Sequence, residues 1–142
     1  MSSEFKLSTI LPHSKRMILI DKIISYAETS LIAEVKITSN SYFLNQQKEL
    51  PAWVISEYMA QAISAWSGIS RLKEGKKIEN GYLLGIRRFK STQPTFSLNC
   101  ILTIEINQVL QDEAGVGVFN CIAQENNQNC VSCVLTVFQK QS

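Results

Sequence analysis

The stretch from residue 51 to residue 73 constrains the fold most, because its pattern is that of a helix with apolar residues around most of its circumference. Proline is favoured in the first helical turn, so Pro51 predicts the start, and Gly75 predicts an end near Lys73. A surface helix shows a narrower apolar stripe, so this helix is predicted to be buried, with other structure wrapped around it. Its apolar residues are Trp53, Val54, Ile55, Tyr58, Met59, Ala62, Ile63, Ala65, Trp66, Ile69 and Leu72.

One narrow polar stripe remains on the predicted helix, at helical spacing. The stripe also interrupts the apolar run, whereas a plain membrane span needs about 20 mostly apolar residues. No membrane span is therefore expected. The stripe consists of Glu57, Gln61, Ser64, Gly68 and Arg71.

The other predicted elements are strands. Residues 31–38 alternate well, with Leu31, Ala33, Val35 and Ile37 on one face. Strands around one long helix indicate the α+β class, with an antiparallel sheet wrapped around a buried helix, which is the hot-dog fold. A free sheet edge needs cover, and pairing with a second copy would supply it. The predicted strands cover residues 17–26, 31–38, 82–89, 98–110, 115–125 and 130–138.

Composition and motifs narrow the classes of function. The chain has 142 residues, of which 45% are hydrophobic and 18% charged, which suits a single domain over residues 1–142. A formal net charge of +2 is too weak to indicate nucleic-acid binding. The sequence contains no phosphate-binding, dinucleotide-binding or zinc-protease motif. It also shows no targeting segment, and the expected location is the cytoplasm.

The four cysteines fit a reducing compartment. Cys130 and Cys133 have the CxxC spacing of some zinc and redox sites. They lie on a predicted strand, where residues an odd number apart face opposite sides, and no second CxxC accompanies them. No metal site is therefore expected, and all four cysteines are predicted to be reduced thiols, mostly buried.

Two side chains are candidates for acid–base chemistry. Glu57 lies in an otherwise apolar helix, and apolar surroundings raise the pKa of a carboxylate toward the range of a general acid or base. The alternative is a solvated glutamate near a helix start. His13 is the only histidine, with a surface-loop histidine as the alternative. Free backbone N–H groups at the helix start, around Ala52 and Trp53, can polarise a carbonyl oxygen.

Two sequence blocks resemble the bacterial 3-hydroxyacyl-carrier-protein dehydratases. Residues 11–23, LPHSKRMILIDKI, are similar to the opening of these enzymes, and residues 50–61, LPAWVISEYMAQ, are similar to the start of their helix. Residues 81–89, GYLLGIRRF, extend the resemblance to the short hot-dog dehydratases of aryl-polyene clusters. The resemblance implies dehydration of 3-hydroxyacyl thioesters on an acyl carrier protein to trans-2-enoyl thioesters, in fatty-acid-like or aryl-polyene biosynthesis. This reaction needs no metal or organic cofactor, so none is expected.

One position departs from the family pattern. The general dehydratases take their catalytic histidine from a GHFP segment before the helix, whereas residues 41–49 contain no histidine. Glu57 matches the catalytic acidic residue of the family, and His13 matches the histidine of the LPH segment. We therefore predict that His13 is the base and Glu57 the acid, with Gln61 orienting Glu57.

The resemblance also implies binding residues and partners. Trp53 and Tyr58 are candidates to line an apolar acyl tunnel, with core packing as the alternative for each. Carrier proteins are acidic, so Arg87, Arg88 and Lys90 are candidates to dock the carrier or its phosphate. The active unit is expected to be a homodimer, or a heterodimer with a related hot-dog subunit.

Two other functions stay open. The missing GHFP histidine allows a non-catalytic subunit that completes a related dehydratase. A hot-dog thioesterase also uses a carboxylate and a helix N-terminus, but it would release free acid and expose a thiol.

Overall fold

The computed structural model describes residues 7–10 and 18–140. Its secondary structure belongs to the predicted α+β class, with one long helix among strands. The elements are α1 (Leu7–Ile10), β1 (Lys22–Tyr26), β2 (Ser30–Lys36), β3 (Leu50–Pro51), α2 (Val54–Lys73), β4 (Gly81–Ser91), β5 (Thr95–Phe96), β6 (Ile101–Gln111), β7 (Val116–Glu125) and β8 (Gln128–Gln139).

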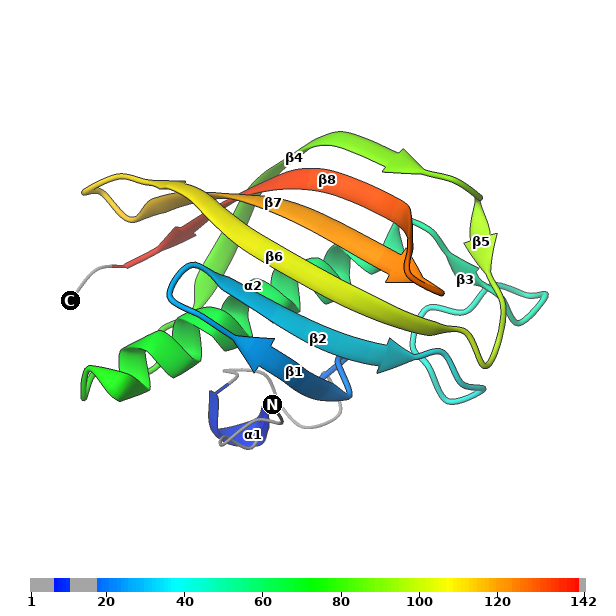
Figure 1. The fold of residues 1–142 in the computed structure, drawn as a ribbon, viewed down its shortest axis with the longest axis horizontal. Helices are drawn as coiled ribbons and strands as arrows, with labels where there is room; N and C mark the ends of the chain where they lie inside the picture. The colour runs from blue at the N-terminus through cyan, green and yellow to red at the C-terminus, as the bar shows by residue number, and fades with distance from the viewer. Residues whose placement is uncertain (1–6, 11–17, 141–142) are drawn as a thin grey trace.

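Six strands form one antiparallel sheet in the order β1-β2-β6-β7-β8-β4, and this sheet curves over α2 (Figure 1). The chain leaves β2, passes along α2 and enters β4 at the opposite edge of the sheet. β3 and β5 form a separate two-stranded pair. The predicted arrangement, an antiparallel sheet wrapped around one long helix, is therefore confirmed.

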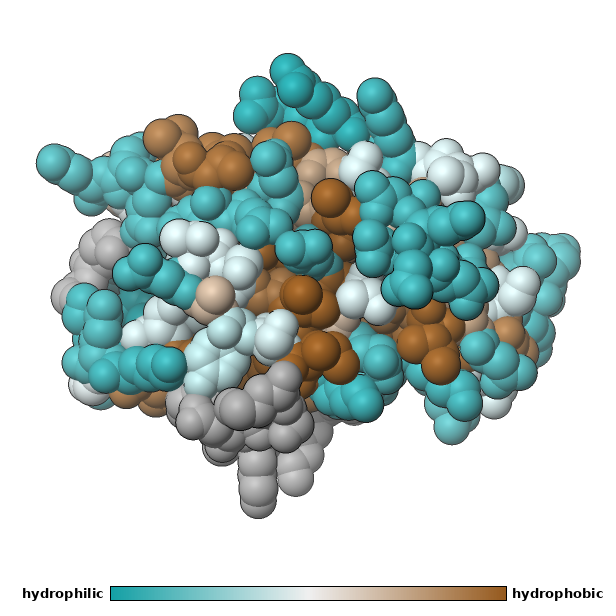
Figure 2. Space-filling view, in the orientation of Figure 1, coloured by the Kyte–Doolittle hydropathy of each residue, from teal (hydrophilic) through white to brown (hydrophobic). Residues whose placement is uncertain are grey.

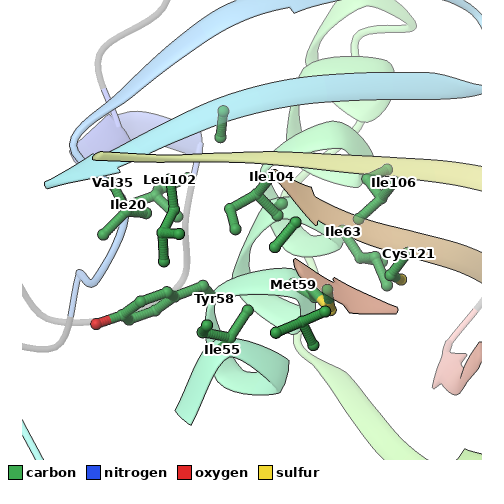
Figure 3. Close-up of a cluster of buried hydrophobic side chains, with 14 of the residues drawn as sticks. Ile20, Val35, Ile55, Tyr58, Met59, Ile63, Leu102, Ile104, Ile106 and Cys121 are labelled. Carbon is green, nitrogen blue, oxygen red and sulfur yellow. The ribbon is translucent and has the colours of Figure 1, made fainter. Parts of the chain in front are cut away.

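The core lies between α2 and the concave face of the sheet. Side chains on a strand alternate between its two faces, so every second residue of β2 and β6 points at the helix. The four residues predicted to share one face of residues 31–38 are all buried. Figure 3 shows side chains of α2 meeting those of the sheet, among them Ile55, Met59, Ile63, Leu102, Ile104, Ile106 and Cys121.

α2 ends where the sequence predicts but begins three residues later. Gly75 follows the helix with a φ of +74°, a left-handed conformation that glycine adopts readily. The prediction that Pro51 opens the helix is wrong, because Pro51 lies in β3 and pairs with Thr95 of β5. This pairing joins residues far apart in the sequence, so no local helix signal reports it.

The predicted polar stripe of α2 divides into an exposed part and a buried part. Glu57 is exposed, whereas Gln61 and Arg71 are only 4% and 7% exposed. The Arg71 guanidinium donates to the side-chain oxygen of Gln139 at 3.1 Å and to the carbonyl of Lys140. Hydrogen bonds of this kind allow polar groups to be buried. In the described part of the chain, no helix has the length and apolar character of a membrane span.

The four cysteines are free and buried, as predicted. Cys121 of β7 and Cys133 of β8 lie opposite each other. The hydrogen bond between the two thiols raises the pKa of Cys121 and lowers the pKa of Cys133. Cys133 Sγ also lies 3.5 Å from Met59 Sδ, so these sulfur atoms pack as part of the core. Among the residues described, no three His, Cys, Asp or Glu side chains cluster as metal ligands would.

β4 forms one edge of the sheet and is exposed along most of its length. Within residues 18–140, only β8 pairs with it. Its exposed apolar side chains include Tyr82 and Leu84, each 59% exposed. A long apolar edge strand offers unpaired backbone groups to another chain. β4 is therefore an edge strand suited to the partner that the sequence analysis expects.

A second exposed apolar area lies where β6 turns into β7, and Figure 2 shows hydrophobic surface at this end of the molecule. Val109 and Leu110 are the exposed residues here. The register between β6 and β7 shifts between Gln108 and Leu110. A bulge of this kind bends a strand and redirects its side chains, which separates the inward Gln108 from the exposed pair.

Gly68 lies at a close approach between α2 and α1, and this contact generates a stability prediction. A Cβ atom at this position would collide with the backbone carbonyl of Ile10. We expect Gly68→Ala to lower the free energy of unfolding by about 1–3 kcal/mol, the usual cost of overpacking. Urea denaturation measures this change.

Gly81→Ala is the matched control, because its Cβ would lie 3.7 Å from the Phe138 carbonyl oxygen, an ordinary contact. Equal stability of the Gly68→Ala and wild-type proteins would show that α1 does not pack tightly on α2.

Candidate functional site

A cavity of about 480 Å³ lies beside α2, where the helix meets the ends of β4, β6, β7 and β8. Small-molecule sites are usually cavities of this size, mostly apolar with a few polar groups. The polar lining from α2 includes Glu57, Gln61, Ser64 and Ser67. The apolar lining includes Leu19, Phe43, Ile63, Trp66, Phe119 and Val137.

Glu57 enters this cavity from the first turn of α2. Its side chain is exposed in the single chain, so the apolar surroundings predicted for it are not supplied by this chain's own packing. A substrate or a partner subunit that covers the cavity would remove water from the carboxylate. Glu57 therefore lies where the predicted acid is needed, and its role as the acid stays a prediction.

Gln61 follows Glu57 by one helical turn and is buried. Its side-chain oxygen accepts hydrogen bonds from the backbone N–H groups of Leu19 and Ile20, the latter at 3.1 Å. Gln61 therefore holds the segment before β1 against the helix. The sequence analysis assigned Gln61 the role of orienting Glu57. It did not predict that Gln61 also attaches the segment before β1 to the helix.

His13 lies outside the described residues, so its role as the base stays a prediction. The described residues that follow it include Leu19, which lines the same cavity as Glu57. Gln61 lies one helical turn after Glu57 and accepts a hydrogen bond from the backbone N–H of Leu19, so it holds Leu19 at this part of the helix. The attachment thus brings the chain that follows His13 to the cavity.

The backbone at the start of α2 is only partly free. The N–H of Ala52 donates to the Pro94 carbonyl at 2.9 Å, so it is not available to a substrate. The carbonyl of Trp53 accepts the hydroxyl of Ser56. Within the described residues, no acceptor pairs with the N–H of Trp53. Of the two N–H groups proposed to polarise a carbonyl, only that of Trp53 is therefore free in this part of the chain.

Three exposed aromatic side chains gather near the start of α2. The Phe43 ring is tilted against the Trp53 ring, with centroids 5.9 Å apart, and against the Tyr42 ring, with centroids 6.2 Å apart. Phe43 has a φ of +71°, a conformation that non-glycine residues adopt rarely. It also lines the cavity, whereas Trp53 does not. The sequence analysis examined residues 41–49 only for a histidine and so missed Phe43.

Tyr58 does not line the Glu57 cavity and lies in the core among buried hydrophobic side chains, where it is 2% exposed (Figure 3). Burial, with a smaller contribution from the charge of Asp21, raises the pKa of Tyr58 to about 12. Tyr58 borders a different depression, of about 500 Å³, beside β1 and β2. Its position matches the core-packing alternative more closely than the tunnel-lining role.

Arg87, Arg88 and Lys90 are exposed on β4, away from the Glu57 cavity. The register between β4 and β8 shifts between Arg87 and Lys90, and Arg88 has a φ of +55°. No ion pair engages these three cations within the described chain. They are therefore available to an acidic partner, and their docking role stays a prediction.

Comparison with known families identifies the chain at the level of family. A family model described as ApeP-like, ApeP dehydratase, matches residues 5–142. The chain belongs to the ApeP-like dehydratase family. It is also similar to a chain of a solved structure, the dehydratase heterocomplex ApeI:P from Xenorhabdus doucetiae. The two chains are 30% identical with a TM-score of 0.92, and the match covers 99% of this chain and 94% of the other. The predicted hot-dog dehydratase of the aryl-polyene type is thus confirmed.

More distant structures share the fold alone. A hypothetical thioesterase with coenzyme A from Streptococcus pneumoniae TIGR4 is 18% identical with a TM-score of 0.64, covering 84% of this chain and 85% of that chain. The PaaI protein from the phenylacetic acid degradation operon of E. coli is 14% identical with a TM-score of 0.63, covering 82% and 80%. No curated protein sequence matches significantly.

The hydrogen bonds of Gln61 generate a prediction about the segment before β1. Gln61→Leu removes the acceptor and leaves the N–H groups of Leu19 and Ile20 unpaired. An unpaired buried polar group costs about 1–3 kcal/mol, and we expect a loss of stability of that size. Hydrogen exchange should also become faster at these two amides.

Gln61→Glu is the matched control, because a carboxylate oxygen can still accept both hydrogen bonds. Unchanged exchange at Leu19 and Ile20 in Gln61→Leu would rule out Gln61 as the attachment of this segment.

Proposed function

We propose that the chain dehydrates 3-hydroxyacyl thioesters carried on an acyl carrier protein, giving trans-2-enoyl thioesters and water. The match of residues 5–142 to the ApeP dehydratase family carries the proposal. The position of Glu57 in a cavity of about 480 Å³ supports it, because an acyl chain needs such a cavity beside the reacting carbons.

The proposed mechanism moves one proton at each of two neighbouring carbons. His13 takes the proton from C2, and Glu57 gives a proton to the hydroxyl at C3, which leaves as water. A double bond then forms between C2 and C3. The N–H of Trp53, which has no acceptor among the described residues, would donate to the thioester carbonyl oxygen, where negative charge develops as the C2 proton departs. Gln61 would act by holding the segment that follows His13.

A hot-dog partner subunit is part of the proposal. The exposed edge of β4 offers a strand for pairing, and the exposed Glu57 cavity offers a surface that a partner would close. The similar structure from Xenorhabdus doucetiae is named as a heterocomplex. We therefore propose pairing with a related subunit, with a second copy of this chain as the alternative.

The heterocomplex also favours a second candidate function. In that case the chain would complete the site of a related subunit and contribute no catalytic base. The lack of a histidine in residues 41–49 fits this function. The thioesterase alternative receives no such support, because the thioesterase neighbour shares only the fold.

The first test measures enoyl formation from a 3-hydroxyacyl carrier-protein substrate by the purified chain, alone and with any hot-dog subunit that co-purifies. We expect Glu57→Gln and His13→Ala each to lower kcat by about 10²–10⁴-fold, the usual contribution of a general acid or base. Glu113→Gln, an exposed change in the β6–β7 turn, is the control and should keep full activity.

The two variants separate the candidates. Loss of activity in Glu57→Gln but not in His13→Ala would show that another group is the base. A wild-type chain that is silent alone and raises the activity of its partner would support the non-catalytic function. Melting temperatures of the variants distinguish lost chemistry from lost folding.

A second test concerns the docking of the carrier. We expect the double variant Arg87→Glu/Arg88→Glu to raise KM for the carrier-bound substrate at least tenfold and to leave KM for a small pantetheine thioester unchanged, because only the carrier is acidic. Lys36→Glu/Lys48→Glu makes the same charge change at exposed positions elsewhere. Equal losses on both substrates would exclude docking on β4.

A further inference from the structure

A second cavity, of about 700 Å³, adjoins the Glu57 cavity near the C-terminal half of α2. Its lining differs, because it includes charged side chains at the helix end and on the β1–β2 turn. Five residues border both cavities and therefore lie between them. They are Trp66, Ser67, Gln108, Gln111 and Gln139.

Hydrogen bonds hold the three glutamines between the cavities, and we call these three residues the amide layer. Gln108 Nε2 donates to Gln111 Oε1 at 2.8 Å. The Gln139 side-chain oxygen accepts the Ser67 hydroxyl, and its Nε2 donates to the Glu79 carbonyl at 2.8 Å. The amide layer thus takes two side chains from β6 and one from β8, and Gln139 ties its part of the layer to α2 and to the segment before β4.

Packing holds Gln108 and its neighbours in place. Trp66 meets the ring of Phe119 edge-on, with centroids 5.5 Å apart, and donates its indole N–H to the Ala27 carbonyl. Gly117 of β7 is close to both groups, because a Cβ atom there would come within 3.1 Å of the Phe119 ring and 3.4 Å of Gln108 Nε2. The absence of a side chain at Gly117 therefore makes room for both groups.

The helix gives the length of the Glu57 cavity. Glu57 and Ser67 line it ten residues apart, and a helix rises 1.5 Å per residue, so they lie about 15 Å apart along the axis. An extended backbone covers about 3.3–3.6 Å for every three bonds. The distance from Glu57 to the amide layer therefore matches roughly a dozen bonds of an extended acyl chain.

We propose that the amide layer sets the longest apolar acyl chain that the Glu57 cavity accepts, an inference that rests on the proposed function. A chain that passed the layer would separate Gln108 from Gln111. It would also bring methylene groups among the charges of the second cavity, which include Arg71, Lys73 and Glu74. Neither the polar amide groups nor the charged second cavity stabilises buried methylene groups, so affinity stops rising with chain length at the amide layer.

The test measures binding of unreactive alkyl phosphopantetheine thioethers, from six to twenty carbons, by calorimetry. The protein is the purified chain together with any subunit that co-purifies. In the wild type, we expect affinity to rise up to roughly fourfold per methylene and then to level off where the chain exceeds about a dozen bonds beyond the reacting carbons. In Gln108→Ala/Gln111→Ala, the rise should continue by at least two further methylenes.

The control is Gln46→Ala/Gln47→Ala, which removes two exposed amides outside both cavities and should keep the wild-type limit. Should the double variant fail to fold, Gln111→Ala alone opens the same hydrogen bond from an exposed position.

The outcomes separate the amide layer from the proposed function. A wild-type affinity that keeps rising past the limit, or an unchanged limit in the Gln108 and Gln111 variants, would overturn the role of the layer while leaving an acyl pocket intact. Failure of every thioether to bind would overturn the acyl pocket and the layer together. Because the ligands do not react, a catalytically silent chain can still give the expected result.

Discussion

Burial of α2 against one face of a six-stranded sheet is the interaction on which the rest of the structure depends. The sheet covers the helix from β2 to β8, and the side chains between them form the core. This leaves one side of the helix for other purposes. Glu57, Ser64 and Ser67 lie on that side and line the cavity. The same burial that stabilises the fold therefore determines where polar chemistry can occur.

The uncovered side of α2 explains why a partner is expected from the geometry as well as from the family. A carboxylate at a solvent-exposed cavity reacts in water, whereas acid–base catalysis gains strength in a site from which water is excluded. The exposed cavity and the edge strand β4 lie next to each other, since Tyr82 and Leu83 of β4 line the cavity. One docking event along β4 would therefore extend the sheet and shelter the site together.

Much of this arrangement could be predicted from local patterns in the sequence. Alternation placed Leu31 and Val35 in the core, and the apolar circumference of residues 54–73 predicted a buried helix. Features that join distant residues could not be predicted. The pairing of Pro51 with Thr95 delays the helix start, and the Pro94 carbonyl takes up the N–H of Ala52. The amide layer draws on β6 and β8, and no short motif reports it.

The segment that contains His13 is attached at both of its ends to the same helix. Ile10 packs on Gly68 before it, and Gln61 holds Leu19 and Ile20 after it. The two attachment points are seven helix residues apart, or about 10 Å along the axis. Loss of either attachment, at Gly68 or at Gln61, would release one end of the segment that carries His13, so two residues far from His13 in the sequence help to set where that segment lies.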